Sequence, residues 1–154
     1  MPTTILRRFG LSALLSLLLL GLVLPASPAH ADSPALSVSA SAATVTPGGT
    51  VTLSLTFTNV HDTPVQFIYQ SVQPTWATTQ VPGLSFTLSS DTVGYTAPVA
   101  PGAATTVTLS YQVAADSACG VRIDLYTYLY YEYQSGTLTD SALQDLPGSE
   151  VLCA

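Results

Sequence analysis

The chain has 154 residues, a net charge of −6 and only three basic residues, two of which, Arg7 and Arg8, lie near its beginning. Nucleic-acid binding needs Lys and Arg to neutralise phosphates, so this composition excludes it and also disfavours binding to anionic membrane surfaces. The partners that remain are neutral, cationic or apolar molecules.

The first 31 residues differ from the rest of the chain. Arg7 and Arg8 precede an apolar run at residues 9–24, and small residues at Ala29 and Ala31 follow it. This order is typical of a secretory signal peptide cleaved after Ala31, and the run is shorter than the roughly 20 residues of a membrane-spanning helix. A retained membrane anchor is the alternative. We therefore expect a secreted, extracellular or cell-surface protein whose mature chain is residues 32–154.

Beyond the signal peptide, apolar residues alternate with Ser and Thr between Pro-Gly and Ser-Gly turn signals, which predicts antiparallel strands and no helix. In chain order the predicted strands are residues 36–40, 50–59, 65–69, 84–88, 93–97, 105–113, 121–134, 137–142 and 150–153. Seven to nine short strands at this spacing predict one all-β domain, an immunoglobulin-like Greek-key β-sandwich.

Two of these strands share a motif. Residues 47–57 (PGGTVTLSLTF) and 101–113 (PGAATTVTLSYQV) both run from Pro-Gly through a short spacer into Thr-Val-Thr-Leu-Ser. In a Greek-key sandwich we expect them to be neighbours in one sheet. The two stretches resemble the immunoglobulin-like β-sandwich modules of bacterial surface and secreted proteins, notably the repeat domain called DUF11. That resemblance implies a structural or binding role and brings no catalytic residue.

The mature chain contains two cysteines, Cys119 and Cys153. In an exported protein a disulfide is the expected state of such a pair. It would close a loop of about 34 residues, for which chain entropy gives about 3.5 to 4 kcal/mol. A metal site or a reactive thiol is the alternative.

Residues that could support catalysis are few. His61 lies beside Asp62 in a turn, where Asp62 is expected to bond its own backbone, although a Ser-His-Asp arrangement assembled in space stays open. Asp124 and Glu132 lie about 27 Å apart on one strand, too far for the two carboxylates of a glycosidase. We expect no enzymatic activity and no cofactor.

Five acidic residues in predicted loops raise the alternative of a calcium site, but they lack a D-x-D-x-D spacing. These residues are Asp91, Asp116, Asp140, Asp145 and Glu150. We expect them to be solvated and no metal to be bound.

The single tryptophan, Trp76, lies in a loop between Pro74 and Pro82. We expect its ring to fold over one end of the sandwich and close the core. The alternative is an exposed ring that stacks on a glycan.

Tyrosines are concentrated in residues 121–134, and the pleat of a single strand would divide them between its two faces. The core face would carry Val121, Ile123, Leu125, Leu129, Tyr131 and Tyr133, and the outer face Arg122, Asp124, Tyr126, Tyr128, Tyr130 and Glu132. The row Tyr126, Tyr128 and Tyr130 is therefore a candidate contact surface for a protein partner or a second copy of the chain.

Three alternatives to that contact surface stay open. The rings could simply cover neighbouring strands, because tyrosine has a high β-propensity. Together with Trp76 they could form a carbohydrate-binding module for neutral glycans. The domain could also be a structural extracellular subunit that pairs with another copy through the edge strand at residues 36–40.

Overall fold

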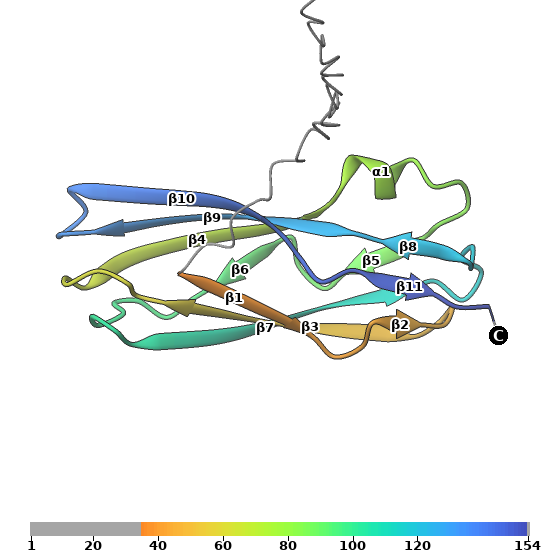
Figure 1. Cartoon of the computed structure of the whole chain (residues 1–154), viewed down its shortest axis with the longest axis horizontal. Helices are drawn as coiled ribbons and strands as arrows, with labels where there is room; N and C mark the ends of the chain where they lie inside the picture. Colours follow the sequence, from red (N-terminus) through yellow and green to blue (C-terminus); the bar gives the residue numbers. More distant parts are fainter. Residues whose placement is uncertain (1–34, 154) are drawn as a thin grey trace, which may run out of the picture.

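The computed structural model describes residues 35–153 and is shown in Figure 1. The predicted signal peptide, residues 1–31, lies outside the described residues. In chain order the elements are β1 (Leu36–Ala40), β2 (Thr44–Val45), β3 (Thr50–Thr58), β4 (Val65–Pro74), α1 (Trp76–Thr79), β5 (Phe86–Leu88), β6 (Thr92–Gly94), β7 (Ala104–Val113), β8 (Val121–Ile123), β9 (Leu125–Tyr133), β10 (Leu138–Asp145) and β11 (Ser149–Val151).

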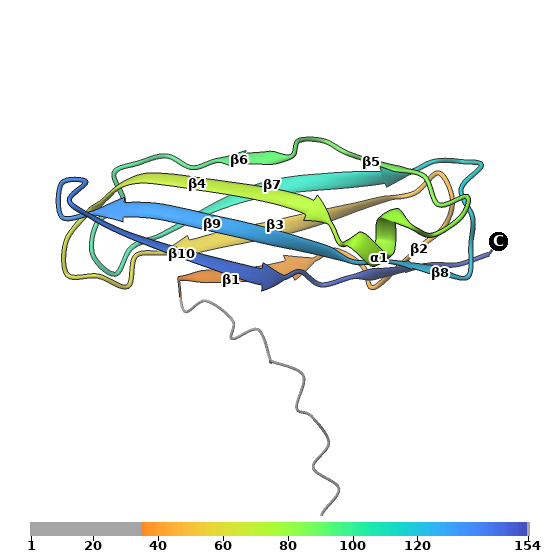
Figure 2. The same cartoon turned by 90° about the horizontal axis from the view of Figure 1, so that it is seen from above.

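The strands form two layers packed face to face (Figures 1 and 2). One sheet has the order β1-β3-β7-β5, the other has the order β10-β9-β4-β6, and a small third sheet, β2-β11-β8, continues the second layer at one end. The order β1-β3-β7-β5 corresponds to strands A-B-E-D of an immunoglobulin-like sandwich, and β10-β9-β4 corresponds to strands G-F-C, with the short β6 added beside β4. The predicted all-β Greek-key fold is confirmed.

The two strands that share the Thr-Val-Thr-Leu-Ser motif are neighbours, as predicted. β3 pairs with β7 in antiparallel register, and Leu53 lies opposite Leu109. Because side chains alternate between the faces of a strand, the apolar residues of both strands point into the sandwich. Val51, Leu53 and Phe57 have no exposed surface, so this pair supplies much of the core.

Two segments leave one sheet and join the other. β1 pairs with β3, but β2, four residues further on, pairs in parallel with β11 of the opposite layer. β5 pairs with β7, and β6 then crosses to pair with β4. The two-residue β2 was not predicted, because so short a strand carries no detectable alternation.

The predicted single strand at residues 121–134 is divided at Asp124 into β8 and β9. The division arises because residues at the start of α1 form hydrogen bonds with the backbone of Asp124. The N–H of Thr75 and the hydroxyl of Thr78 both donate to the carbonyl oxygen of Asp124, at 3.0 Å each. The N–H of Asp124 donates in turn to the Thr78 hydroxyl at 2.9 Å. This helical turn therefore satisfies the backbone groups that a neighbouring strand would otherwise pair.

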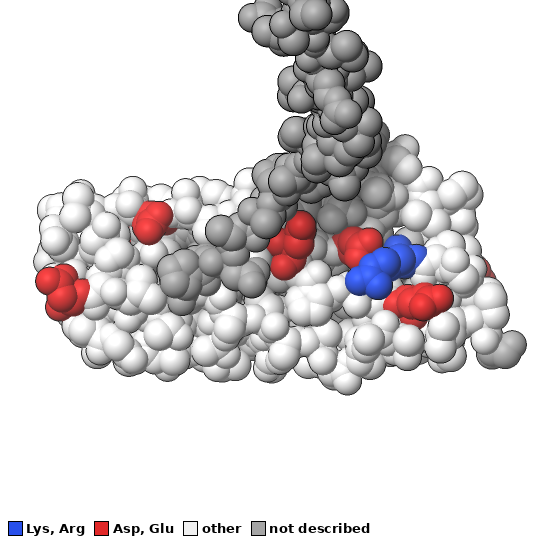
Figure 3. Space-filling model, viewed as in Figure 1, with Lys and Arg blue, Asp and Glu red and all other residues white. Residues whose placement is uncertain are grey.

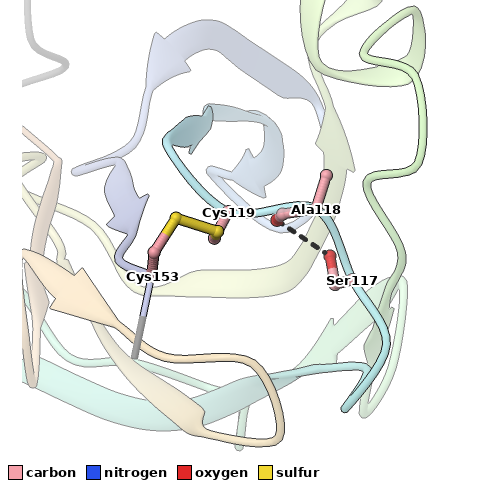
Figure 4. Close-up of a disulfide and its surroundings, with 4 residues drawn as sticks. All are labelled: Ser117, Ala118, Cys119 and Cys153. Atoms are coloured by element: carbon pink, nitrogen blue, oxygen red, sulfur yellow. Dashed lines mark hydrogen bonds between the residues drawn. A yellow bond between two sulfur atoms is a disulfide. The ribbon is translucent and has the colours of Figure 1, made fainter.

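The disulfide between Cys119 and Cys153 is present, as predicted, with its Cα atoms 5.0 Å apart (Figure 4). Cys119 precedes β8 and Cys153 follows β11, and these two strands pair in antiparallel register. The bond therefore joins opposite positions just beyond a paired strand end and ties the C-terminal strand to the sheet.

β4 extends five residues beyond its predicted end at Tyr69, through Pro74. Its alternation is hidden because Gln70 is polar yet fully buried. The Gln70 amide donates to the Thr127 hydroxyl at 2.8 Å and accepts from the Tyr95 hydroxyl at 2.5 Å. Thr127 donates onward to the carbonyl oxygen of Ser71 at 2.7 Å, so the buried polar groups of this network satisfy one another.

Within residues 35–153, no helix has the length and apolar character needed to cross a membrane.

Candidate functional site

The outer face of the β4–β9–β10 sheet collects aromatic side chains. Tyr126, Tyr128 and Tyr130 of β9 are half-buried on this face, while the residues between them are buried in the core, so the predicted division of the strand is confirmed. The register places Tyr69 opposite Tyr130 and Phe67 opposite Glu132. We call the set Phe67, Tyr69, Tyr126, Tyr128 and Tyr130 the aromatic face.

Two residues of the aromatic face were missed by sequence reasoning. Phe67 and Tyr69 lie on β4 and are 48% and 41% exposed. The alternation of aromatic and polar letters in the segment VQFIYQ was a usable signal, but their position beside the tyrosine row depends on strand pairing. The pairing joins residues about sixty positions apart, which a single sequence does not reveal.

Two pairs of rings on the aromatic face contact each other across β4 and β9, one edge to face and one tilted. The ring centroids of Phe67 and Tyr130 are 6.2 Å apart with an interplanar angle of 65°, and those of Tyr69 and Tyr128 are 6.5 Å apart at 57°. Tilted contacts of this kind are the favoured geometry for aromatic pairs. The paired rings therefore pack at an angle to one another and expose ring edges and hydroxyls to solvent as well as ring faces.

Hydrogen bonds hold both ends of the tyrosine row. The Tyr126 hydroxyl donates to the side-chain oxygen of Gln73 at 2.8 Å, and the Tyr130 hydroxyl donates to a carboxylate oxygen of Glu132 at 2.9 Å. The bond to Glu132 raises the pKa of Tyr130 above the ordinary tyrosine value. Both hydroxyls are thus fixed in orientation.

Charge is sparse on the neighbouring edge of the sandwich. Figure 3 shows mostly uncharged atoms there and one cationic group between acidic ones. Arg122 is the only basic residue among residues 35–153, and its Nε lies 2.7 Å from Oδ1 of Asp124. The described surface therefore has no cation that lacks an acidic partner.

The expectation that Trp76 closes one end of the core is wrong. The residue begins the single-turn helix α1, and its side chain is 78% exposed. Thr78 takes the buried position instead, since its hydroxyl both donates to and accepts from the backbone of Asp124, whereas an indole can only donate. Figures 1 and 2 show α1 standing out from the layer that contains β4 and β9, on the side away from the other sheet.

A shallow hollow of about 470 Å³ lies beside α1. Thr75 and Ala77 line it from the helix, and Asp124 and Asp145 line it from the sheet. Since Asp145 pairs with Tyr126, the hollow adjoins one end of the aromatic face. The Trp76 ring belongs to the same helical turn but does not line the hollow.

His61 does not lie in the simple solvated turn that we expected. Its ring stacks on Tyr133 at a centroid distance of 3.7 Å, and its Nε2 lies 3.3 Å from the hydroxyl of Tyr131. That hydroxyl donates to Oδ2 of Asp140 at 3.1 Å. Asn59 organises the turn through its Oδ1, which accepts the N–H of His61 at 3.0 Å. These contacts fasten the turn to β9 and β10.

No group of three or more His, Cys, Asp or Glu side chains within residues 35–153 is arranged so that it could hold a metal ion. The five acidic residues considered for calcium therefore do not come together in this part of the chain.

No family model and no curated protein matches the chain. Among solved structures, the chain is similar to the crystal structure of a FixG-related protein from Vibrio parahaemolyticus. The identity is 15%, the TM-score is 0.38, and the match covers 74% of this chain and 96% of the other. A likeness at this level assigns neither a family nor a function, and the resemblance to DUF11 modules stays a prediction.

Proposed function

We propose that the protein is a secreted, non-catalytic interaction module that binds a protein partner through the aromatic face. The observation that carries this proposal is the collection of five half-exposed or exposed rings from two strands on one outer sheet face. Rings of this size give a patch on the order of several hundred Å², and tyrosine is enriched in protein interfaces.

The composition of the opposite sheet indicates that strands of this fold form without aromatic residues on their outer face. The outer faces of β3 and β7 carry Thr and Ser instead, for example Thr52 opposite Ser110 and Thr56 opposite Thr106. The two threonines of the second pair bond each other through their hydroxyls at 2.8 Å. Since a sheet of this fold forms with a hydroxyl face, high β-propensity alone does not account for the aromatic residues on the other one.

The ring geometry favours a protein over a sugar as the ligand of the aromatic face. A pyranose ring stacks on an open, flat aromatic face, whereas Phe67 and Tyr69 meet the neighbouring tyrosines at steep angles. Edge-to-face rings with oriented hydroxyls suit the mixed apolar and polar contacts of a protein interface.

The test compares the mature protein, residues 32–154, with a variant in which Tyr126, Tyr128 and Tyr130 are replaced by serine. A matched control replaces Thr52, Thr106 and Thr108 of the opposite outer face by serine. If the partner is a second copy, light scattering gives an oligomer for the parent and the control and a monomer for the tyrosine variant.

If all three proteins are monomeric, the partner is a different protein or a glycan, and a neutral glycan array distinguishes the two. Glycan binding that is lost in the tyrosine variant and kept in the control would replace the protein-partner assignment by a carbohydrate-binding one.

A neutral glycan is the second candidate ligand, and the exposure of Trp76 favours it. The ring is 78% exposed beside a hollow that carries two carboxylates, which can accept hydrogen bonds from sugar hydroxyls. Because Trp76 is the single tryptophan in the chain, its fluorescence reports binding at α1 directly. A sugar that shifts this emission in the parent, with affinity lost in Trp76→Ala, would establish the second candidate.

A further inference from the structure

We propose that the open edge of β10 binds an extended, cationic segment of a partner protein by strand addition. β10 is the outermost strand of its sheet and pairs only with β9. The register runs without a shift from Leu138 opposite Tyr133 to Asp145 opposite Tyr126. This is a long, regular edge that another strand can extend.

The hydrogen-bond pattern shows which backbone groups of β10 face outward. The N–H of Leu146 donates to the carbonyl oxygen of Leu125 at 2.9 Å, which fixes the ladder with β9. In an antiparallel pair every second residue directs its N–H and C=O away from the partner. The outward residues are therefore Thr139, Ser141, Leu143 and Asp145, of which Ser141 already donates its N–H to the Asp140 side chain. β10 contains no lysine, proline or bulge, and the protection of its edge rests on the charges of Asp140 and Asp145, which oppose pairing with a like-charged strand.

The charge of the edge decides the occupant. β10 carries two carboxylates, Asp140 and Asp145. Asp140 accepts the N–H of Ser141 at 2.8 Å and the hydroxyl of Tyr131, whereas Asp145 has no ion-pair partner among the described residues. If a second copy of the chain added its own β10, carboxylates of both copies would repel each other along the interface between the strands. A strand bearing Lys or Arg would instead neutralise these carboxylates.

The added strand would also meet an apolar position. Leu143 lies opposite Tyr128 and is 54% exposed, so a partner side chain beside it removes apolar surface from water. This binding mode uses the backbone of β10 and its carboxylates. It therefore stands or falls separately from the aromatic face as a protein-binding surface.

The test uses isothermal titration of the mature protein with a blocked decapeptide of alternating lysine and valine, and with a matched peptide of glutamate and valine. We expect one lysine peptide to bind per chain, with affinity that falls as salt rises because exposed charges are screened. The glutamate peptide should not bind. In NMR hydrogen exchange, the lysine peptide should protect the N–H of Leu143.

Three variants separate the contributions. Leu143→Pro removes an outward N–H but no bond to β9, so the fold should persist and affinity should fall at least about tenfold. Leu143→Thr keeps the N–H and should retain most of the binding. Tyr128→Ser should bind the lysine peptide as the parent does, which distinguishes this edge from the aromatic face.

Asp145→Lys reverses a charge without changing the hydrogen bonds between β9 and β10. It should lower the affinity for the lysine peptide by about threefold or more. The Asp145→Lys variant remains a test of the proposal if the melting curve shows that Leu143→Pro has unfolded. Absence of lysine-peptide binding at low salt would overturn the proposal and leave the carboxylates as guards against pairing between copies. Equal affinity for the two peptides, or unchanged affinity in both Leu143→Pro and Asp145→Lys, would overturn it as well.

Discussion

Removal of the disulfide should lower stability mainly by freeing the unfolded chain. Cys153 is exposed and Cys119 is half-buried, so a double replacement by serine exposes little apolar surface and leaves no large cavity. The flanking ladder between β8 and β11 is unchanged by the replacement. The cost therefore comes from the loop that the bond closes in the unfolded chain.

The size of the effect follows from the sequence separation of 34 between the two cysteines. The chain-entropy relation gives about 3.8 kcal/mol at 25 °C for a loop of that length. For a domain of this size, about 1 kcal/mol corresponds to roughly 3 to 5 °C in Tm, so Cys119→Ser/Cys153→Ser should melt about 11 to 19 °C below the parent.

Differential scanning calorimetry of the oxidised parent, the parent under reducing conditions and the double variant measures this directly. The reduced parent and the variant should melt together, well below the oxidised parent. Equal Tm values for the oxidised parent and the variant would refute the reasoning. They would mean that the unfolded chain without the bond already keeps the two cysteine segments close together.

Three further predictions concern a tightly packed glycine, a hydrogen-bond network and a buried tyrosine. An added Cβ on Gly148 would lie 2.8 Å from a backbone carbonyl oxygen of β8, so Gly148→Ala should cost about 1 to 3 kcal/mol in urea unfolding, whereas Gly94→Ala, which meets no atom within 4 Å, should be nearly neutral. Gln70→Leu removes the acceptor of the partly buried Tyr95 hydroxyl and should cost about 1 to 3 kcal/mol; adding Tyr95→Phe should restore most of this loss, and no recovery would contradict the network. Burial and the nearby carboxylate of Asp140 raise the pKa of Tyr131 above its ordinary value of 10.0, so the folded state holds this proton more tightly. The stability it contributes is complete below about pH 10 and is lost as pH rises further, and Tyr131→Phe should flatten this part of the unfolding free energy against pH.

Strict alternation made the central strands predictable. In β3 every second residue is apolar and buried, and its partner β7 repeats the same letters, so both the strands and their pairing followed from the pattern. A half-buried strand needs that alternation in order to cover the core, which is why the physical constraint is visible in the sequence.

The pattern failed where polar groups occupy core positions. Gln70 and Thr127 lie on the inner face without breaking the strands, because they bond each other and the backbone of Ser71. Alternation cannot report a buried polar residue, since the partners that satisfy it come from another strand. The same limit explains Trp76, whose large apolar ring predicted burial while the smaller Thr78 fitted the backbone of Asp124.

Some features of the aromatic face follow from the alternation of one strand, and others depend on its pairing with a second strand. The direction of Tyr126, Tyr128 and Tyr130 depends only on the two-residue period of β9, so one strand sufficed to predict it. How far the rings protrude depends instead on β4, which places Tyr69 and Phe67 against them. A row of three tyrosines would be a narrow stripe, but the pairing widens it to two strands and tilts the rings into mutual contact. The breadth and roughness on which the proposed protein binding rests are therefore properties of the paired sheet. Replacing Phe67 and Tyr69 should weaken the binding of the proposed partner as much as replacing the tyrosines of β9.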